Sequence, residues 1–270
     1  MKEKIGIIGC GNIGLQVAGF VKKELGSKFV LACLWDNNKP ALTRAFRKFK
    51  VKPAGSLQNL IKKCSIIVEC ASQDAVQQLF SWPELLKNKR IIVISIGGII
   101  ENLDKILPLL EKYHIELYIP SGAICGIDGI SSAALGKVKK CLITTTKPPR
   151  GLEGSSYLSK RRISLKNLTQ EKVVFSGDVF KAVKYFPKNI NVAATLYLAL
   201  QRKVKVKVKI IASPFVKRNI HRVELLSNVA NIKLEVENLP SVSNPKTSAL
   251  TVFSINKLLS NLASFLKIGT

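Results

Sequence analysis

The feature that most constrains the fold of this chain is a glycine-rich turn near its beginning, Gly9-Cys10-Gly11-Asn12-Ile13-Gly14, with the spacing G-x-G-x-x-G. It follows the short apolar run Lys4–Gly9 and opens a segment of helical spacing, Asn12–Gly26. In such a strand–turn–helix, the first glycine permits a tight turn, the second lets the backbone approach a pyrophosphate, and the third lets helix and strand pack closely. The helix N-terminus then offers N–H groups to the phosphates. The pattern predicts a dinucleotide-binding domain.

Asp36 lies where the dinucleotide-binding pattern has an acidic residue that contacts the ribose. Phe29–Trp35 is predicted as a buried strand, and Asp36 follows it, about 20 residues after the last glycine of the turn. There it can accept hydrogen bonds from the ribose hydroxyls of NAD and repel the 2′-phosphate of NADP, although the polar residues Asn37–Lys39 could soften that rejection. The alternative is an ordinary N-cap or turn carboxylate. Its position favours the ribose role.

Strand-like and helix-like segments alternate over the first ~119 residues, as in parallel sheets covered by helices on both faces. We therefore expect an α/β fold with a Rossmann-type parallel-sheet domain. The expected strands are Lys4–Gly9, Phe29–Trp35, Ser65–Cys70, Arg90–Ile96 and Ile115–Ile119, and the expected helices are Asn12–Gly26, Pro40–Phe49, a helix closing at Leu60–Cys64, Asp74–Leu86 and Leu103–Lys112.

The pattern changes after Pro120 and indicates a second, α+β domain. Lys203–Ile210 (KVKVKVKI) alternates at period two, which predicts a half-buried antiparallel strand with a lysine face. Gly151–Ser164 is basic and rich in Ser and Gly, and we expect an exposed loop there. Ser248–Leu266 has helical apolar spacing and is expected to return to the first domain. The expected domains are residues 1–119 plus 245–270 for the dinucleotide and 120–244 for substrate and dimerisation. Further expected elements are strands at Leu142–Thr146, Val173–Ser176, Ile220–Leu226 and Ile232–Val236 and a buried helix at Val192–Leu200.

Composition excludes several classes of protein. The net charge of +26 attracts polyanions. The basic residues are scattered without a nucleic-acid-binding motif, so a general lysine bias is the preferred explanation and nucleic acid is not an expected partner. The six cysteines form no CxxC pair, and neither a disulfide framework nor a metal site is expected. The first strand begins almost at the N-terminus and no apolar run is long enough to span a bilayer, so we expect a cytoplasmic protein without membrane contact.

The second half carries several short motifs that composition alone does not interpret. Taken together and in this order, they resemble the L-aspartate dehydrogenase family, and the resemblance runs from the glycine turn almost to the C-terminus. Its most specific parts are the FPKNINVAA and NPKTS segments. The motifs are Pro120–Ile124, Lys147–Pro149, Phe186–Ala194, Asn219–His221 and Asn244–Ser248.

The resemblance implies an enzyme that deaminates L-aspartate oxidatively with NAD or NADP as hydride acceptor. The first product would be iminoaspartate, which hydrolyses to oxaloacetate and ammonia, and the family is associated with NAD biosynthesis. It also implies a homodimer built through the second domain's sheet, where the lysine face would oppose like charges across a symmetric interface. The family's catalytic histidine falls on His221, and its nicotinamide contacts fall on Ala123 and Asn191.

His221 also suits this chemistry by residue type, because histidine exchanges protons near neutral pH. Amine oxidation removes a proton from the ammonium, and imine hydrolysis needs an activated water. The alternative is a surface histidine on a basic segment, since Lys217, Arg218 and Arg222 are close in sequence. The family commonly has an acidic residue before the proline upstream of this histidine, where this chain has Ser213-Pro214. A carboxylate that tunes His221 is therefore in doubt.

Other candidate residues stay open. The two substrate carboxylates require basic or hydroxyl groups, but a surface role is the more common one for any single lysine. Asn189 and Asn191 could cap the helix that follows them or hold the nicotinamide carboxamide. Cys70 and Cys125 are expected to pack as small core residues rather than act as nucleophiles. The candidates for carboxylate binding are Lys147, Lys188, Lys246, Thr247 and Ser248.

Two other functions compete with this hypothesis. A related Rossmann dehydrogenase or reductase for another anionic substrate, such as homoserine or dihydrodipicolinate, would share the two-domain plan but would not need this set of motifs. A non-catalytic NAD-sensing, nucleic-acid-binding protein would explain the charge and predicts salt-sensitive binding without turnover.

Overall fold

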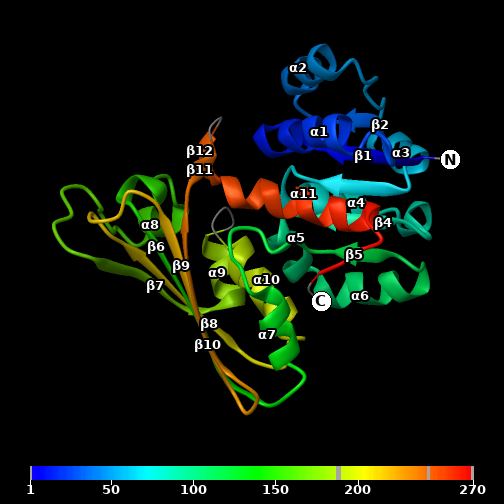
Figure 1. Ribbon diagram of the computed structural model, residues 1–270. Coiled ribbons are helices and arrows are strands. Elements are labelled where there is room, and N and C mark those ends of the chain that lie inside the picture. The colour runs from blue at the N-terminus through cyan, green and yellow to red at the C-terminus, as the bar shows by residue number, and fades with distance from the viewer. Residues whose placement is uncertain (1, 187–189, 242–243, 269–270) are drawn as a thin grey trace. The chain divides into compact units, whose positions relative to one another are not determined.

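The computed structural model describes residues 2–186, 190–241 and 244–268, and the chain divides into two compact units. The first unit comprises Met1–Pro120 and Val252–Lys267, and the second comprises Ser121–Thr251 with Ile268–Thr270. The elements of both units are labelled along the chain in Figure 1.

The first unit is built on a five-stranded sheet in the order β2-β1-β3-β4-β5, with every neighbouring pair parallel. β2 lies on one side of β1, and β3 lies on the other, so the direction in which strands are added reverses at β1. Parallel sheets bind their ligands beside such a reversal, at the carboxyl ends of the strands. β3 is buried over its whole length, as expected of a strand covered on both faces. The expected Rossmann-type parallel sheet is confirmed. The strands are β1 (Glu3–Ile8), β2 (Phe29–Trp35), β3 (Ile66–Glu69), β4 (Arg90–Val93) and β5 (Glu116–Tyr118).

The helices of the first unit include one from the far end of the sequence. α11 (Ala249–Ala263) contributes Val252, Ile255 and Leu259 to the same hydrophobic cluster as Ile7 of β1 and Val17 of α1. The prediction that the last helix returns to the first domain is confirmed, because this helix is part of the hydrophobic core of the first unit. The other helices are α1 (Asn12–Glu24), α2 (Lys39–Phe49), α3 (Leu57–Lys63), α4 (Gln73–Phe80), α5 (Ile96–Glu101) and α6 (Leu103–Lys112), with a 3-10 turn at Pro83–Leu86.

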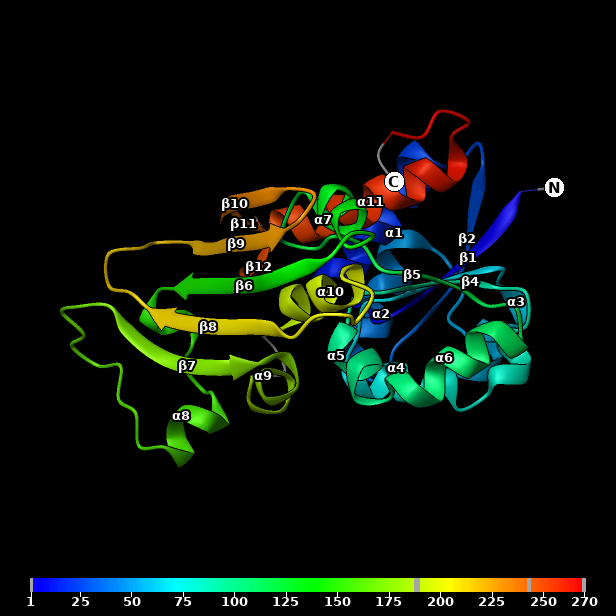
Figure 2. The same cartoon turned by 90° about the horizontal axis from the view of Figure 1, so that it is seen from below.

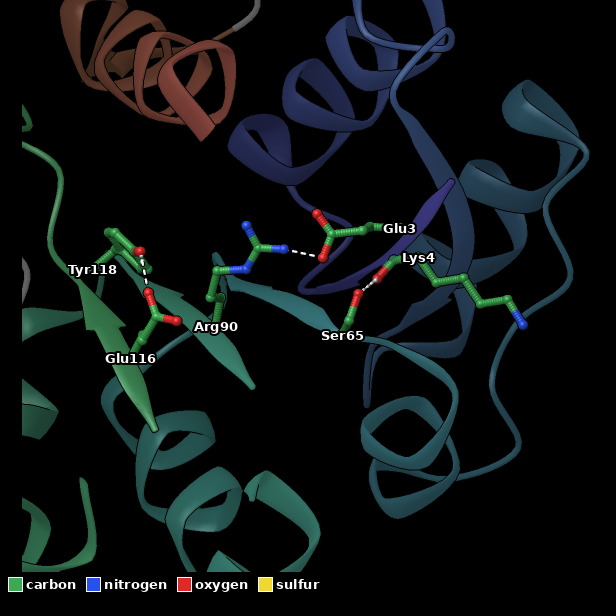
Figure 3. Close-up of polar contacts among 6 residues, drawn as sticks. All are labelled: Glu3, Lys4, Ser65, Arg90, Glu116 and Tyr118. Atoms are coloured by element: carbon green, nitrogen blue, oxygen red, sulfur yellow. Dashed lines mark hydrogen bonds and ion pairs between the residues drawn. The ribbon is translucent and has the colours of Figure 1, made fainter. Parts of the chain in front are cut away.

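Polar contacts tie the amino-terminal edge of this sheet together (Figure 3). Arg90 at the start of β4 forms an ion pair with Glu3 at the start of β1. The Ser65 hydroxyl, just before β3, donates to the Lys4 carbonyl at 3.4 Å, and Tyr118 donates to the Glu116 carboxylate within β5. The contacts of Glu3 with Arg90 and of Ser65 with Lys4 lie at the edge opposite the glycine turn, which follows the carboxyl end of β1.

The second unit is built on a mixed sheet in the order β10-β9-β6-β8-β7, whose strands lie side by side in Figure 2. Strand β8 alternates buried and more exposed residues as expected, but the prediction that it is antiparallel is only half right. It pairs antiparallel with β7 and parallel with β6, because period-two alternation fixes which face is buried and not the direction of the partner. The strands are β6 (Val138–Lys147), β7 (Lys172–Asp178), β8 (Val206–Ala212), β9 (Asn219–Ser227) and β10 (Asn231–Asn238), with a separate pair β11 (Pro240–Ser241) and β12 (Asn244–Ser248).

Helices α9 and α10 pack against β7 and β8 on one face of this sheet. The predicted buried helix Val192–Leu200 is confirmed as α10. The expected exposed loop Gly151–Ser164 is wrong in part, because it contains α8 and buries Leu152 and Leu158. The helices are α7 (Ile127–Ala133), α8 (Ser156–Lys160), α9 (Val179–Tyr185) and α10 (Asn191–Ala199), with a 3-10 turn at Pro149–Gly151.

Candidate active site

The three glycines of the turn between β1 and α1 each have a separate steric reason. Gly9 has φ +97°, and a Cβ there would lie 2.8 Å from the Cys70 carbonyl carbon. A Cβ on Gly14 would lie 1.9 Å from the Gly9 carbonyl oxygen, so this glycine lets α1 pack on the turn. A Cβ on Gly11 would meet no described protein atom within 4 Å. The turn is therefore tight at Gly9, closely packed at Gly14 and open at Gly11, as a pyrophosphate site requires.

The N-terminus of α1 presents its first backbone N–H groups without a side-chain cap. Its N-cap is Gly11, and the first turn contains no acidic residue. Asn12 and Ile13 use their side chains elsewhere: the Asn12 Oδ1 accepts from the Gln16 amide at 3.1 Å, and Ile13 packs against the core cluster. What these residues can offer a ligand is backbone N–H groups at the positive end of a helix, which suits phosphate.

A pocket of about 510 Å³ adjoins the turn in the first unit. Its lining includes Gly9, Gly11, Asp36 and Arg44, together with Asp74 at the start of α4. Two of the predicted glycines, Gly9 and Gly11, thus share one pocket with the predicted ribose-binding Asp36 at the carboxyl edge of the sheet. A pocket of this size with a glycine turn at its edge fits part of a dinucleotide.

Asp36 links the end of β2 to the glycine turn. The Cys10 backbone N–H donates to its Oδ2 at 2.6 Å, and the Asn38 N–H donates to its Oδ1 at 2.7 Å. The N-cap of α2 is Asn38, which accepts from Ala41, so Asp36 is not a cap. It does form the turn contact that was the alternative to a ligand role. Each carboxylate oxygen keeps a second lone-pair direction.

Glu69 is a buried site residue that sequence reasoning missed. Its Oε1 accepts from the N–H groups of Ala71 (2.7 Å) and Ser72 (2.9 Å) and from the Ser95 hydroxyl (3.0 Å). Its Oε2 accepts from the N–H groups of Ser95 (3.1 Å) and Ile94 (3.4 Å). Burial raises its pKa, although these donors act in the opposite direction. The signal available beforehand was an acidic residue inside the apolar run Ser65–Cys70.

Through these bonds, Glu69 holds two loops at the carboxyl edge of the sheet in one arrangement. The segment Cys70–Ser72 lines the pocket, whereas Ile94 and Ser95 lie between β4 and α5. The carboxylate thus fixes part of the pocket wall without lining the pocket itself.

His221 lies on the buried face of the second sheet, and the alternative of a surface histidine is wrong. It sits on β9 opposite Thr145 of β6, whose hydroxyl lies 2.9 Å from its Nδ1. Burial, and then the charge of Lys147, lower its pKa to about 3. The ring is therefore neutral near pH 7. Among the described residues, the groups that act on it are a hydroxyl and a cation rather than a carboxylate.

Lys147 adds a second titratable group beside this pair. It follows Thr145 by two residues on β6, so both side chains leave the same face of the sheet. It is only 7% exposed, and burial lowers its pKa to about 8. Sequence reasoning named Lys147 among several carboxylate-binding candidates and could not distinguish it, since burial is a property of the fold.

Ala123 and Asn191 occupy two further places in the second unit. The Ala123 carbonyl accepts from the Asn238 amide at 3.0 Å, and the Ser248 hydroxyl donates to Asn238. Asn191 is the first residue of α10, whose N-cap is Ile190, so the suggestion that Asn191 caps the helix is wrong. Its Oδ1 is buried and has no hydrogen-bond partner among the residues that the structure describes, which motivates a ligand role.

Several other candidates are only partly placed. Thr247 is partly buried at the end of β12. Lys188 and Asn189 lie outside the described residues, as does the side chain of Lys246. These positions add nothing to the geometry of the site.

The two cysteines differ from each other. Cys70 lines the pocket, and burial raises its pKa well above the ordinary range, so it stays a thiol and is a poor nucleophile. Cys125 is exposed, and the expectation that it packs in the core is wrong.

Comparison with known proteins assigns the family. Residues 9–120 match the family described as homoserine dehydrogenase, NAD binding domain, and residues 128–262 match aspartate dehydrogenase, C-terminal. The chain is 38% identical over 272 residues to an L-aspartate dehydrogenase of Methanosarcina mazei, with 99% of both chains covered. It is 37% identical over 270 residues to one from Methanococcus maripaludis, again with 99% of both covered. The chain belongs to the L-aspartate dehydrogenase family.

Solved structures agree with this assignment. The crystal structure of aspartate dehydrogenase from Thermotoga maritima has a TM-score of 0.75 and 31% identity, with 100% of both chains covered. A myo-inositol dehydrogenase from Lactobacillus casei, in complex with NAD(H) and myo-inositol, has a TM-score of 0.55 and 11% identity, and shares the fold alone. The resemblance to the L-aspartate dehydrogenase family seen in the motifs is confirmed. Within the part of the chain that the structure describes, no helix is long and apolar enough to cross a membrane.

Proposed function

We propose that this chain oxidises the α-amino group of L-aspartate to iminoaspartate, with NAD as hydride acceptor, and that hydrolysis then gives oxaloacetate and ammonia. The observation that carries the proposal is His221, a neutral histidine held by Thr145 on the buried face of the second sheet, in a chain related over its whole length to L-aspartate dehydrogenases. A buried imidazole has no structural need for this position, which an apolar residue would fill at lower cost.

The residues of the first unit fit the cofactor. The open space at Gly11 and the first N–H groups of α1, from Asn12 and Ile13, suit a pyrophosphate, while Gly9 and Gly14 give the turn its shape. Asp36 would accept from the ribose hydroxyls in the same pocket. NAD, when bound, supplies the acceptor for the hydride.

The residues of the second unit supply positioning and proton exchange. The unpartnered Oδ1 of Asn191 would accept from the nicotinamide carboxamide, and the backbone at Ala123, held by Asn238, would contact the same group. His221 would take up the proton released from the substrate ammonium and pass it to solvent. The neutral ring would then accept a proton from the water that attacks the imine. Its lowered pKa makes His221 a weak base in the protein without substrate. The two carboxylates of bound aspartate would raise that pKa, because nearby negative charge favours the imidazolium.

The finer assignments belong to the same proposal. NADP is a weaker second acceptor, because Asp36 repels its 2′-phosphate. Arg44 lines the same pocket, and its positive charge offsets part of that repulsion. The iminoaspartate serves NAD biosynthesis in the cytoplasm. The division of labour follows the expected domains, residues 1–119 plus 245–270 for the cofactor and 120–244 for the substrate and the homodimer.

The homodimer would use the open face of the second sheet. Like charges need not oppose each other there, because Lys207 shares that face with acidic residues. Arg222 of β9 pairs with Glu235 of β10, and Glu224 is exposed beside them. This mixture of signs supports a symmetric contact more readily than lysines alone would.

The test uses the two histidines of the chain as a matched pair. Purified protein is mixed with L-aspartate and NAD or NADP at alkaline pH, and reduced cofactor is followed by absorbance. We expect turnover that His221→Ala lowers by at least about a hundredfold and that His114→Ala leaves unchanged, with D-aspartate inert. The absence of turnover despite measurable NAD binding would contradict the proposal and favour another anionic substrate; salt-sensitive nucleic-acid binding without turnover would favour the sensing function.

A further inference from the structure

Lys147 occupies a position where a lysine is costly. It is the last residue of β6, the central strand of the sheet, which pairs with β9 on one side and β8 on the other. Its register partner on β8 is Ala212, and the residues before it on the same face are Ile143 and Thr145. A charged side chain in such surroundings loses hydration and destabilises the fold unless it serves a ligand or a partner.

The backbone around Lys147 is held firmly. Its carbonyl accepts from the Ser213 N–H at 2.9 Å, which continues the β6–β8 ladder by one step, and Ser213 is fully buried. The chain then leaves the strand through Pro148 and the 3-10 turn Pro149–Gly151. The position of the ammonium relative to Thr145 and His221 is therefore set by sheet register and not by a flexible loop.

Other lysines of the same sheet behave differently. Lys207 of β8 and Lys140 of β6 are exposed on the opposite face. Among these three, Lys147 alone combines burial with the face that carries His221. Its charge adds to burial in lowering the pKa of His221. A cation and a neutral imidazole on one buried face form a site complementary to a carboxylate.

We propose that Lys147 is the carboxylate-binding residue of this site and holds one carboxylate of a small dicarboxylate substrate beside His221. The proposal deepens the function proposed above, on which the identity of the substrate rests. The ammonium donates to the carboxylate, and the bound negative charge offsets the repulsion between Lys147 and a protonated His221. Lys147 thus both positions the substrate and makes proton uptake by His221 easier once the substrate is present.

Succinate is the probe, because it has both carboxylates of aspartate and no amine to oxidise. Calorimetry measures its binding to the NAD-loaded protein, and steady-state assays measure its inhibition of L-aspartate oxidation. In Lys147→Met, we expect succinate affinity to fall by about ten- to a hundredfold, the loss of one charge-assisted hydrogen bond. KM for L-aspartate rises by a similar factor, kcat changes less, and the Kd for NAD is unchanged.

Two further variants separate charge from packing. Lys207→Met makes the same replacement on the exposed face and leaves succinate binding as in the parent protein. Lys147→Arg keeps the cation and retains more affinity than Lys147→Met. Circular dichroism identifies the folded variants, and Lys147→Gln takes the place of the methionine variant if that one does not fold.

The outcomes distinguish this inference from the function on which it rests. Unchanged succinate binding in a folded Lys147→Met protein overturns the inference, and so does an equal loss in the arginine and methionine variants. If the parent protein does not oxidise L-aspartate but binds succinate through Lys147, the proposed function fails and the carboxylate subsite stands.

Discussion

Replacement of Glu69 by glutamine tests how the loops around the pocket are held. Each carboxylate oxygen accepts two backbone N–H groups, from Ala71 and Ser72 on one side and from Ile94 and Ser95 on the other. Glutamine keeps the shape but turns one oxygen into an NH₂ group. In the less costly orientation, that NH₂ faces the Ser95 N–H, which loses its acceptor, and the Ile94 N–H, which also donates to the Glu69 backbone carbonyl at 3.3 Å.

The size of the effect follows from these bonds. One unsatisfied buried N–H costs about 1–3 kcal/mol. Removal of the buried charge, whose pKa burial raises, recovers part of this. We expect a net loss of about 1–2 kcal/mol in the free energy of unfolding. Because Cys70–Ser72 line the pocket, affinity for NAD falls as well.

Urea unfolding at neutral pH measures the stability, and calorimetry measures NAD binding. Glu101→Gln, at an exposed position that ends α5, makes the same chemical change and should stay within about 0.5 kcal/mol of the parent protein. A Glu69→Gln protein as stable as this control, with unchanged NAD affinity, would refute the view that the carboxylate holds the two loops.

Three further predictions follow from the geometry. Gly11→Ala should leave the free energy of unfolding within about 0.5 kcal/mol and weaken NAD binding in calorimetry, because its Cβ meets no described protein atom; Gly14→Ala should lose both stability and binding, because its Cβ would lie 1.9 Å from the Gly9 oxygen. His221 has a pKa of about 3 in the folded protein against an ordinary 6.5. The free energy of unfolding is therefore unaffected by this group above pH 6.5 and falls as the pH drops towards 3, because only the unfolded chain takes up the proton. Urea titrations at pH 7.5 and 5 should show a loss of about 2 kcal/mol that His221→Asn lacks; equal slopes in both proteins would contradict the buried neutral ring. Lys147 has a folded pKa of about 8 against 10.5, so stability rises with pH between 8 and 10.5 and is insensitive to this group below 8. The rise in the free energy of unfolding should reach about 3 kcal/mol and be absent in Lys147→Met. If the parent protein shows no such rise, Lys147 is solvated.

The sequence predicts those parts of the fold that depend on local chemistry. The apolar runs of the first unit became strands close to their expected bounds, since uninterrupted burial leaves a clear pattern. The predicted strand Arg90–Ile96 ends earlier, at Val93, and Gly97-Gly98 lies within α5. A Cβ on Gly98 would lie 2.8 Å from the Gln73 carbonyl oxygen, so these glycines serve close packing of α4 on α5 rather than a turn. Such a contact between helices is not visible in the local sequence.

Other differences have equally physical causes. The predicted helix Asp74–Leu86 is split into α4 and the turn Pro83–Leu86, because a proline cannot donate within a helix. The short helices α7 and α9 were not predicted, since seven residues give too few turns for a clear period. In the candidate site, motif spacing placed the glycine turn and Asp36, and the resemblance to the family placed His221. The sequence alone could neither identify Glu69 nor distinguish Lys147 from the other candidate lysines, because the significance of both depends on burial by residues distant in the sequence.

Because α11 belongs to the core of the first unit, it affects the order in which the chain can fold during synthesis. Val252, Ile255 and Leu259 pack with β1 and α1, although more than half of the chain separates them in sequence. During synthesis, domains usually fold from the N-terminus as they emerge. Here the first sheet emerges early but one of its covering helices arrives almost last. The cofactor-binding unit therefore acquires its complete core only after the second unit has left the ribosome, and in the meantime an apolar flank of the first sheet remains exposed to chaperones.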